Sequence, residues 1–238
     1  MELLTARQVT FAYKRGVNAL DDVDLQVQAG EIVGLIGANG SGKSTFIQLV
    51  FDLLRAQGGT VSIAGRPNNE LSAKLSAMYL PSEDLLPEFL TGLEYLRLVY
   101  SMYKEPFDTS EVEQQLRKFS MLGRENDLIE DYSHGMRKKL QVISALLLDR
   151  PLLAIDETLN GIDLEALNLV EHEFRRLRST GTALLLCTHD FDLLARLADR
   201  IVLLAHGTVL VDSTIDDIRT LHGSIHEMVS SLLFREVG

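Results

Sequence analysis

The sequence is poor in cysteine, in basic residues relative to acidic ones, and in long apolar runs. Cys187 is the single cysteine among 238 residues, which excludes an intramolecular disulfide and fits a reducing cytosol. Because Cys187 lies in the apolar run 183–187, we expect a small buried side chain rather than a reactive thiol.

Basic residues are outnumbered by acidic ones, 23 to 34, which gives a formal net charge of −11. Binding to nucleic-acid backbones depends on clusters of Lys and Arg that release counterions from the phosphates. We therefore expect no nucleic-acid partner, although the basic run 137–139 leaves room for a local basic patch.

No stretch of the sequence approaches the roughly 18 apolar residues that a membrane span needs. The longest candidate, 142–155, is interrupted by Asp149, Arg150 and Pro151. The first residues lack a basic flank followed by an apolar stretch, so we expect no signal peptide. Any membrane role is therefore expected to come through a partner.

The most informative segment that is present is 37–44, which matches the phosphate-binding pattern G-x-x-x-x-G-K-S. Its glycines let the backbone curl so that N–H groups point at phosphate oxygens. Lys43 is expected to reach the β and γ phosphates, and the Ser44 hydroxyl to bind Mg²⁺. The nucleotide contacts expected here come from Gly37, Asn39, Gly40, Ser41, Gly42, Lys43, Ser44 and Thr45.

The flanks of this segment fit the same interpretation. Residues 31–36 predict a buried strand before the loop, and 45–54 predict a helix after it. The positive end of that helix dipole would then face the phosphates. The alternative is a glycine-rich turn between a strand and a helix that binds no ligand.

The remaining patterns predict an α/β fold with three parts. Residues 22–28 alternate strictly, as in a half-buried antiparallel strand, and we expect 3–11 and 60–63 to pair nearby. Helical spacing dominates from 87 to about 150, which predicts a helical insertion. Short apolar runs after it predict buried strands at 152–155, 183–187 and 201–204, with connecting helices at 164–177 and 191–197. We expect one domain over 1–238.

Two carboxylates follow the apolar run 152–155. Asp156 is expected to hold Mg²⁺ through water, and Glu157 to polarise an attacking water. The alternative is a solvated acidic strand end.

Three further segments make the sequence resemble the nucleotide-binding subunit of ATP-binding-cassette (ABC) transporters, a P-loop NTPase family. Residues 132–136, Y-S-H-G-M, stand where that family has its signature, usually L-S-G-G-Q. Residues 160–163, N-G-I-D, match its D-loop, and His189 follows the next apolar strand, where the family has its switch histidine. The resemblance covers about 3–211.

The resemblance implies a role for each matching residue. Ser133 and Gly135 would contact the γ-phosphate held by an opposite subunit, His189 would contact the γ-phosphate, and Tyr13 would stack on adenine. Simpler readings stay open, because Ser133 could merely cap a helix beginning near Arg137 and His189 could be structural.

The chain departs from the family pattern at several positions. Ser82 stands where a Y-x-P-Q setting has glutamine, so its contact with Mg²⁺ depends on a shorter side chain. Glu83, Asp84 or a bridging water could substitute. His134 and Met136 replace a glycine and the glutamine of the signature, and a side chain at His134 must point away from the nucleotide or crowd it.

The resemblance implies an ATPase that needs ATP and Mg²⁺ and works as a head-to-tail homodimer or heterodimer. Its partner would be a separate integral-membrane subunit of an exporter, docked around 85–103 on the cytoplasmic face of the membrane. The alternatives are a soluble cassette ATPase without a transport role and a regulatory nucleotide-binding module. Residues 224–235 predict a last helix, which either packs on its own domain or binds a partner or second copy.

Overall fold

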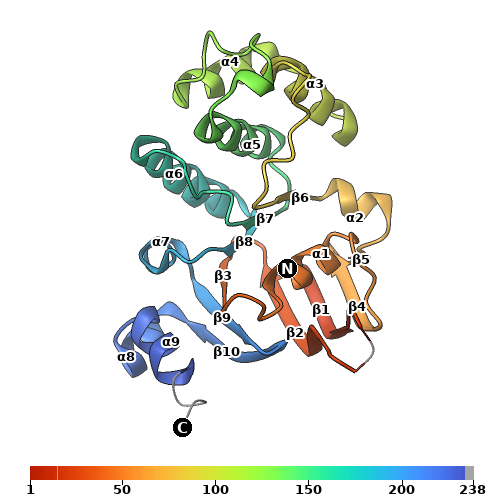
Figure 1. The fold of residues 1–238 in the computed structure, drawn as a ribbon, viewed down its shortest axis with the longest axis vertical. Helices are drawn as coiled ribbons and strands as arrows, with labels where there is room; N and C mark the ends of the chain where they lie inside the picture. The colour runs from red at the N-terminus through yellow and green to blue at the C-terminus, as the bar shows by residue number, and fades with distance from the viewer. Residues whose placement is uncertain (15, 234–238) are drawn as a thin grey trace.

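The computed structural model describes residues 1–14 and 16–233 and contains two β-sheets and several helical layers. A four-stranded antiparallel sheet, seen at the lower right of Figure 1, has the order β2-β1-β4-β5. Its strands are β1 (Glu2–Phe11), β2 (Leu20–Gln28), β4 (Gly58–Ile63) and β5 (Arg66–Pro67). Alternate residues of β2 are buried, as the period of two in its sequence predicts.

A second sheet has six strands in the order β10-β9-β3-β8-β7-β6. Five of them run parallel, and β10 pairs antiparallel at the edge. The strands are β3 (Ile32–Ile36), β6 (Ala77–Leu80), β7 (Leu152–Asp156), β8 (Ala183–Cys187), β9 (Arg200–Ala205) and β10 (Thr208–Thr214). Because the parallel strands share one direction, the loops after β3, β6, β7 and β8 leave at the same edge.

Both faces of the parallel sheet are covered, which explains why its strands read as continuous apolar runs. Val33 and Leu35 of β3 pack with α1 (Lys43–Val50) and the antiparallel sheet, while Ile32 and Ile36 pack with helices on the other face. The helices other than α1 are α2 (Leu71–Leu75), α3 (Gly92–Tyr103), α4 (Thr109–Lys118), α5 (His134–Leu148), α6 (Leu164–Thr180), α7 (Phe191–Leu197), α8 (Ile215–His222) and α9 (Ile225–Leu233).

The helices between β6 and β7 form a layer of their own. Figure 1 shows α3, α4 and α5 together at the top of the molecule, beyond the parallel sheet, with a short 3-10 turn (Ile129–Asp131) before α5. The predicted α/β class, with an N-terminal antiparallel part and a helical insertion, is therefore confirmed.

Three predicted boundaries were wrong. The helix after the glycine-rich loop ends at Val50 rather than 54, because Asp52 adopts a positive φ of 55° and Leu53 is left 62% exposed. β4 begins at Gly58, two residues before the predicted strand 60–63. The helix expected near Arg137 begins at His134. The sequence predicts no separate range for five of the observed elements, namely β5, α2, β6, β10 and α8.

The end of the chain packs on its own domain. Ser224 Oγ accepts a hydrogen bond from the Glu227 backbone N–H (3.1 Å), and Ile225 and Met228 are buried in the main core. Residues 234–235 of the predicted helix lie outside the described residues, as does the side chain of Leu233. Within the described chain, no helix has the length and apolarity needed to cross a bilayer.

Candidate functional site

The loop between β3 and α1 adopts a conformation that requires glycine. Gly42 precedes α1 with a φ of +108°, and a Cβ at this position would lie 2.6 Å from Leu20 Cδ2 and 2.7 Å from the Ala19 carbonyl oxygen. The loop is therefore pressed against the antiparallel sheet just before the first turn of α1, whose first backbone N–H groups have no partner within the helix.

Two side chains of this loop, Ser41 and Lys43, are placed to bind a phosphate. Among the side-chain atoms that the structure describes, Ser41 Oγ is buried without a hydrogen-bond partner. The ammonium of Lys43 folds back over the loop and donates to the carbonyls of Gly37 (2.8 Å) and Ala38 (3.1 Å). Asn39 and Gly40 are exposed at the rim. The loop thus offers a cation, free N–H groups and a hydroxyl to one anion, which fits a nucleotide phosphate.

Tyr13 lies beside the same loop. Its hydroxyl is 3.1 Å from Thr45 Oγ1, its ring edge packs on Phe11 (4.9 Å between centroids), and its side chain is 62% exposed. A hollow of about 410 Å³ opens between Tyr13 and the loop, with Val17 and Gly42 in its wall. The predicted stacking residue therefore borders the predicted phosphate loop.

The acidic residues predicted to act on the phosphate lie at the carboxyl edge of the parallel sheet. Asp156 ends β7 and is 3% exposed, and it pairs in register with Cys187 of β8. Glu157 has a φ of +53° and its N–H donates to the Cys187 carbonyl (2.8 Å). This turn directs the Glu157 carboxylate to His189, whose Nε2 lies 2.8 Å from Glu157 Oε1.

Two neutral groups surround Asp156. The Tyr79 hydroxyl donates to Asp156 Oδ2 across 3.4 Å. Burial, and next the nearby Asp156 carboxylate, raise the pKa of the Tyr79 hydroxyl. The same two causes raise the pKa of the Cys187 thiol, so Cys187 is the buried, unreactive thiol that the sequence predicted.

The residues at hand fit Mg²⁺ only together with a nucleotide. Ser44 presents an exposed hydroxyl in the first turn of α1, and Asp156 supplies a carboxylate. Within the described residues no group of three or more His, Cys, Asp and Glu side chains could hold a metal. Mg²⁺ accepts one or two protein oxygens and completes its octahedron with phosphate and water oxygens. A magnesium ion bound here would therefore depend on the phosphates.

The position of Ser82 relative to the site is given by its backbone rather than by its side chain. The Thr158 hydroxyl, two residues after Asp156, donates to the carbonyls of Leu80 (2.8 Å) and Pro81 (2.9 Å), which brings the segment before Ser82 against the strand end. The exposed Ser82 side chain has no hydrogen bond described, and its carbonyl accepts from Lys138 Nζ (2.5 Å). The structure thus brings Ser82 near the site through its backbone.

The signature-like residues lie at the start of α5. Ser133 caps the helix, since its Oγ accepts from the Met136 N–H (3.3 Å). His134 turns away from the cap: its Nδ1 is 3.2 Å from Asp84 Oδ2, and its ring packs over Gly161 of the 160–163 turn. Gly135 also faces Gly161, whose carbonyl would lie 3.2 Å from an added Cβ.

Within one chain, the two halves of the predicted site remain apart. No described hydrogen bond or ion pair joins Ser133 or Gly135 to residues 37–45, and Figure 1 shows α5 in the helical layer and α1 beside the antiparallel sheet.

Sequence reasoning missed three residues that shape this site: Tyr79, Lys138 and Thr158. Lys138 gave no signal of its own in the sequence, because its neighbours on the same side of α5, His134, Arg137 and Gln141, are polar as well.

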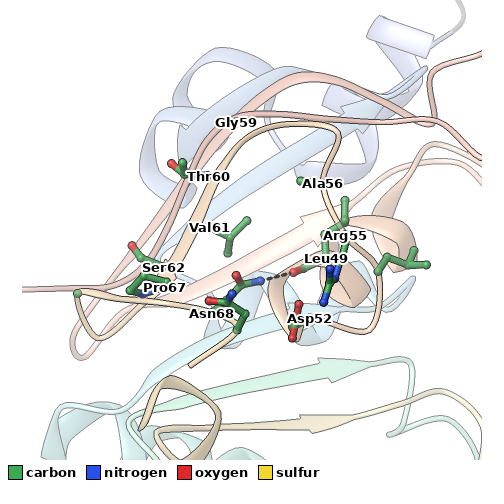
Figure 2. A pocket seen from close by; sticks show the side chains of 13 residues that line it. Leu49, Asp52, Arg55, Ala56, Gly59, Thr60, Val61, Ser62, Pro67 and Asn68 are labelled. Carbon is green, nitrogen blue, oxygen red and sulfur yellow. Dashed lines mark hydrogen bonds between the residues drawn. The ribbon is translucent and has the colours of Figure 1, made fainter. Parts of the chain in front are cut away.

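A polar hollow of about 600 Å³ lies at the other end of α1, between this helix and β4 (Figure 2). There the Asn68 amide donates to the Leu49 carbonyl (2.7 Å) at the carboxyl end of α1. Asn68 thus satisfies a helix end that would otherwise lack a donor. The hollow shares no residue with the predicted nucleotide site.

Comparison with known proteins gives the same assignment. A family model described as ABC transporter matches residues 20–160. The chain is 32% identical over 216 residues to the daunorubicin/doxorubicin resistance ATP-binding protein DrrA of Streptomyces peucetius, covering 88% of this chain and 64% of that protein. It is 30% identical over 227 residues to the ABC-type transporter ATP-binding protein EcsA of Bacillus subtilis, covering 94% and 92%.

Two solved structures are similar as well. One, described as the ATP-binding subunit of an ABC transporter, has a TM-score of 0.89 and 32% identity and covers 97% of this chain and 99% of that chain. A dimeric ATP-binding cassette bound to ADP and Pi, with a TM-score of 0.80, 22% identity and coverage of 89% and 98%, shares the fold. The chain therefore belongs to the ABC transporter family and is one of its ATP-binding ATPase subunits.

Proposed function

We propose that Glu157 and His189 form the catalytic pair of this ATPase, and that hydrolysis drives a separate membrane subunit of an exporter. The observation that carries the proposal is the 2.8 Å contact between His189 Nε2 and Glu157 Oε1 at the sheet edge that also bears the phosphate loop. Glu157 would accept a proton from the attacking water, and His189 would orient the Glu157 carboxylate and contact the γ-phosphate.

The remaining roles follow from position. Lys43, Ser41 and the N–H groups of the 37–45 loop would bind the phosphates, and Tyr13 would stack on the adenine. Ser44 and Asp156 would hold Mg²⁺, with Ser82 contributing through a bridging water. Mg²⁺ would neutralise charge on the phosphate oxygens.

A second subunit would complete the site. Ser133 and Gly135 lie at the start of α5, which belongs to the helical layer in Figure 1, whereas residues 37–45 lie before and in the first turn of α1, beside the antiparallel sheet. Ser133 and Gly135 would therefore cap the γ-phosphate held by an opposite subunit in a head-to-tail dimer of two copies or of two different cassettes. A solved cassette of the same fold is described as dimeric with ADP and Pi bound, which supports this arrangement.

Exposed apolar side chains between β6 and α4 support a membrane partner. Leu85 (77% exposed) and Phe89 (78%) lie in the segment before α3, and Met102 (65%) lies in the last turn of α3. Such a patch would suit a membrane subunit on the cytoplasmic face. Relatives named for drug resistance and for Nod factor export support an exporter. We propose that the whole chain, 1–238, forms one ATPase domain in this assembly.

Steady-state ATPase activity measured against protein concentration, with Mg²⁺, tests the proposal. Specific activity that rises with concentration and vanishes in Glu157→Gln would support catalysis by a transient homodimer. Absence of activity at every concentration, with ATP still bound, would favour a heterodimer or an obligatory membrane partner. Activity that is independent of concentration would contradict the shared site, and co-purification with no multi-span membrane protein would favour a soluble cassette ATPase.

A further inference from the structure

The segment that follows β6 is attached to the start of α5 by a row of side chains on one side of the helix. His134 Nδ1 contacts Asp84 Oδ2 (3.2 Å), Arg137 Nη1 contacts Glu88 Oε1 (2.6 Å), and Gln141 Nε2 donates to the Glu83 carbonyl (3.4 Å). These α5 residues are three or four positions apart, so they line one face of the first two turns. In Figure 1 this segment runs from β6 past α5 to α3.

Lys138 is the buried centre of this row. Its side chain is 1% exposed, and Nζ donates to the Ser82 carbonyl (2.5 Å), which is its one hydrogen bond among the described residues. Desolvation lowers the pKa of Lys138, and the nearby Asp84 carboxylate opposes that shift. An ammonium this deeply buried needs a partner, so its position and that of the Ser82 carbonyl are tied to each other.

The contact joins two parts of the proposed site. Ser82 follows Pro81, whose carbonyl accepts from Thr158 next to Glu157, while Lys138 lies five residues after Ser133, the cap that would meet the opposite nucleotide. The Ser82 side chain is too short to span the distance that a glutamine side chain would span. A backbone link to α5 does not depend on that side chain.

We propose that Lys138 is a positioning residue that holds the segment 82–88 to the first turns of α5, so that the two move as one body when the site closes on ATP. The catalytic role of this attachment rests on the proposed function, in which the site closes between two subunits. The contact between Lys138 and the segment 82–88 lies within one chain. Movement of the signature-like turn would then be passed to the exposed apolar residues Leu85 and Phe89 through α5.

Distances between two spin labels test the attachment. The native Cys187 is buried, so labels placed at Leu85→Cys (77% exposed) and Gln114→Cys (exposed on α4) would report on the segment against the helical layer. With Lys138 present, we expect one narrow distance distribution that ATP and Mg²⁺ leave unchanged. In Lys138→Met, an apolar side chain of similar length, we expect a broader distribution that shifts with ATP. Lys138→Gln keeps an N–H donor and should fall between the two.

Two controls separate the attachment from a general loss of structure. Lys139→Met removes the neighbouring lysine, which pairs instead with Asp163 (2.6 Å), and should leave the distribution narrow. A second label pair, Leu98→Cys on α3 with Gln114→Cys, should stay narrow in every variant. In unlabelled protein, Lys138→Met should lower kcat several-fold and leave the Kd for ATP unchanged, because Lys138 does not touch the nucleotide loop.

An unchanged 85–114 distribution in Lys138→Met overturns the proposal. So does broadening of the control pair, since it would mean that Lys138 merely stabilises the helical layer. Failure of the proposed function gives a different result. If wild-type ATPase activity did not depend on protein concentration, the site shared between two subunits would be contradicted, and the spin-label distances would still decide whether Lys138 holds the segment to α5.

Discussion

His189 Nε2 lies 2.8 Å from Glu157 Oε1, although 31 residues of sequence separate the two strand ends that carry them. β7 and β8 are neighbours in the parallel sheet, so the residues that follow them leave the same edge side by side. The positive φ of Glu157 turns its carboxylate toward the ring instead of along the strand. A positive φ is unfavourable for glutamate, so the backbone of Glu157 is strained in this conformation.

Glu157→Gln should abolish turnover and leave ATP binding intact. An amide of the same size keeps the shape of the site but accepts no proton, and loss of a general base costs about 10²-fold or more in rate. Phosphate release and equilibrium nucleotide binding, measured on the same preparation, check the two halves of this expectation.

Asp190→Asn serves as the matched control. Asp190 is a carboxylate that follows β8 and caps α7, where it accepts a hydrogen bond from the Leu193 N–H (2.8 Å). Asparagine keeps an acceptor at this position. We expect this variant to retain most of the activity. If Glu157→Gln turned over as fast as Asp190→Asn, Glu157 would not be the base.

Ser82→Gln should lower the Mg²⁺ concentration needed for half-maximal ATPase activity. A glutamine side chain reaches further than serine and adds an oxygen ligand at the sheet edge, where Asp156 is the buried carboxylate. Activity titrated with Mg²⁺ at saturating ATP measures the effect. Ser82→Asn, which carries the same amide on a shorter side chain, should behave like the wild type, and equal curves for all three proteins would refute the expectation.

The residues of the proposed site follow from the sequence more directly than the boundaries of the helices and strands do. The glycine loop and the carboxylates after β7 follow from local patterns, and His189 follows from the resemblance to the ABC family. The strands that carry them are parallel, so their ends lie at one edge of the sheet. Tyr79 was not found, since its hydroxyl meets Asp156 only through the pairing of β6 with β7. That pairing joins segments far apart in sequence, and no local pattern encodes it.

Boundary errors have equally local causes. The helix α1 stops at Val50 because the chain reverses at Asp52, and the apolar Leu53 and Leu54 made the helical pattern look longer than it is. α5 starts at His134, three residues early, because Ser133 supplies the cap. Lys138 shows what a pattern of apolar and polar residues cannot reveal: a charged side chain on a buried face whose partner is a backbone carbonyl 56 residues away.

Gly42→Ala should destabilise the fold and prevent ATP binding. The residue has a φ of +108°, and an added Cβ would lie 2.6 Å from Leu20 Cδ2 and 2.7 Å from the Ala19 carbonyl, so the loop must shift. Strain of this kind costs about 1–3 kcal/mol. Thermal unfolding with and without ATP measures both effects, because a ligand that binds only the folded state raises Tm.

Gly65→Ala separates strain from contact. Gly65 also has a positive φ, +74°, but nothing lies within 4 Å of an added Cβ. This variant should lose a smaller amount of stability and keep the rise in Tm with ATP. A Gly42→Ala protein that is stabilised by ATP as much as Gly65→Ala would contradict the role of the loop.

Glu171→Gln should lower stability at neutral pH and make little difference in acid. Glu171 lies on α6, nearly buried, and accepts from Arg196 Nη2 (2.7 Å) and Nε (3.3 Å). Hydrogen bonding from Arg196 is the largest cause that lowers the pKa of this carboxyl, with a smaller contribution from the charge of Arg175. Since the pKa is lower in the folded state, the ion pair stabilises the fold above the unfolded pKa of about 4.3 and stops doing so as the pH falls through the folded value.

We therefore expect the wild type to exceed Glu171→Gln by about 1 kcal/mol in free energy of unfolding at pH 7, a modest figure because Arg196 is half exposed to screening solvent. The gap should narrow as the pH falls below the unfolded pKa of about 4.3 and close once the pH is below the lowered folded pKa, where Glu171 is protonated in both states. Urea unfolding at a series of pH values measures it. Glu113→Gln, on the exposed side of α4, is the matched control and should change the stability little. A gap at Glu171 that persists undiminished in acid would mean that the side chain stabilises α6 by packing rather than by its charge.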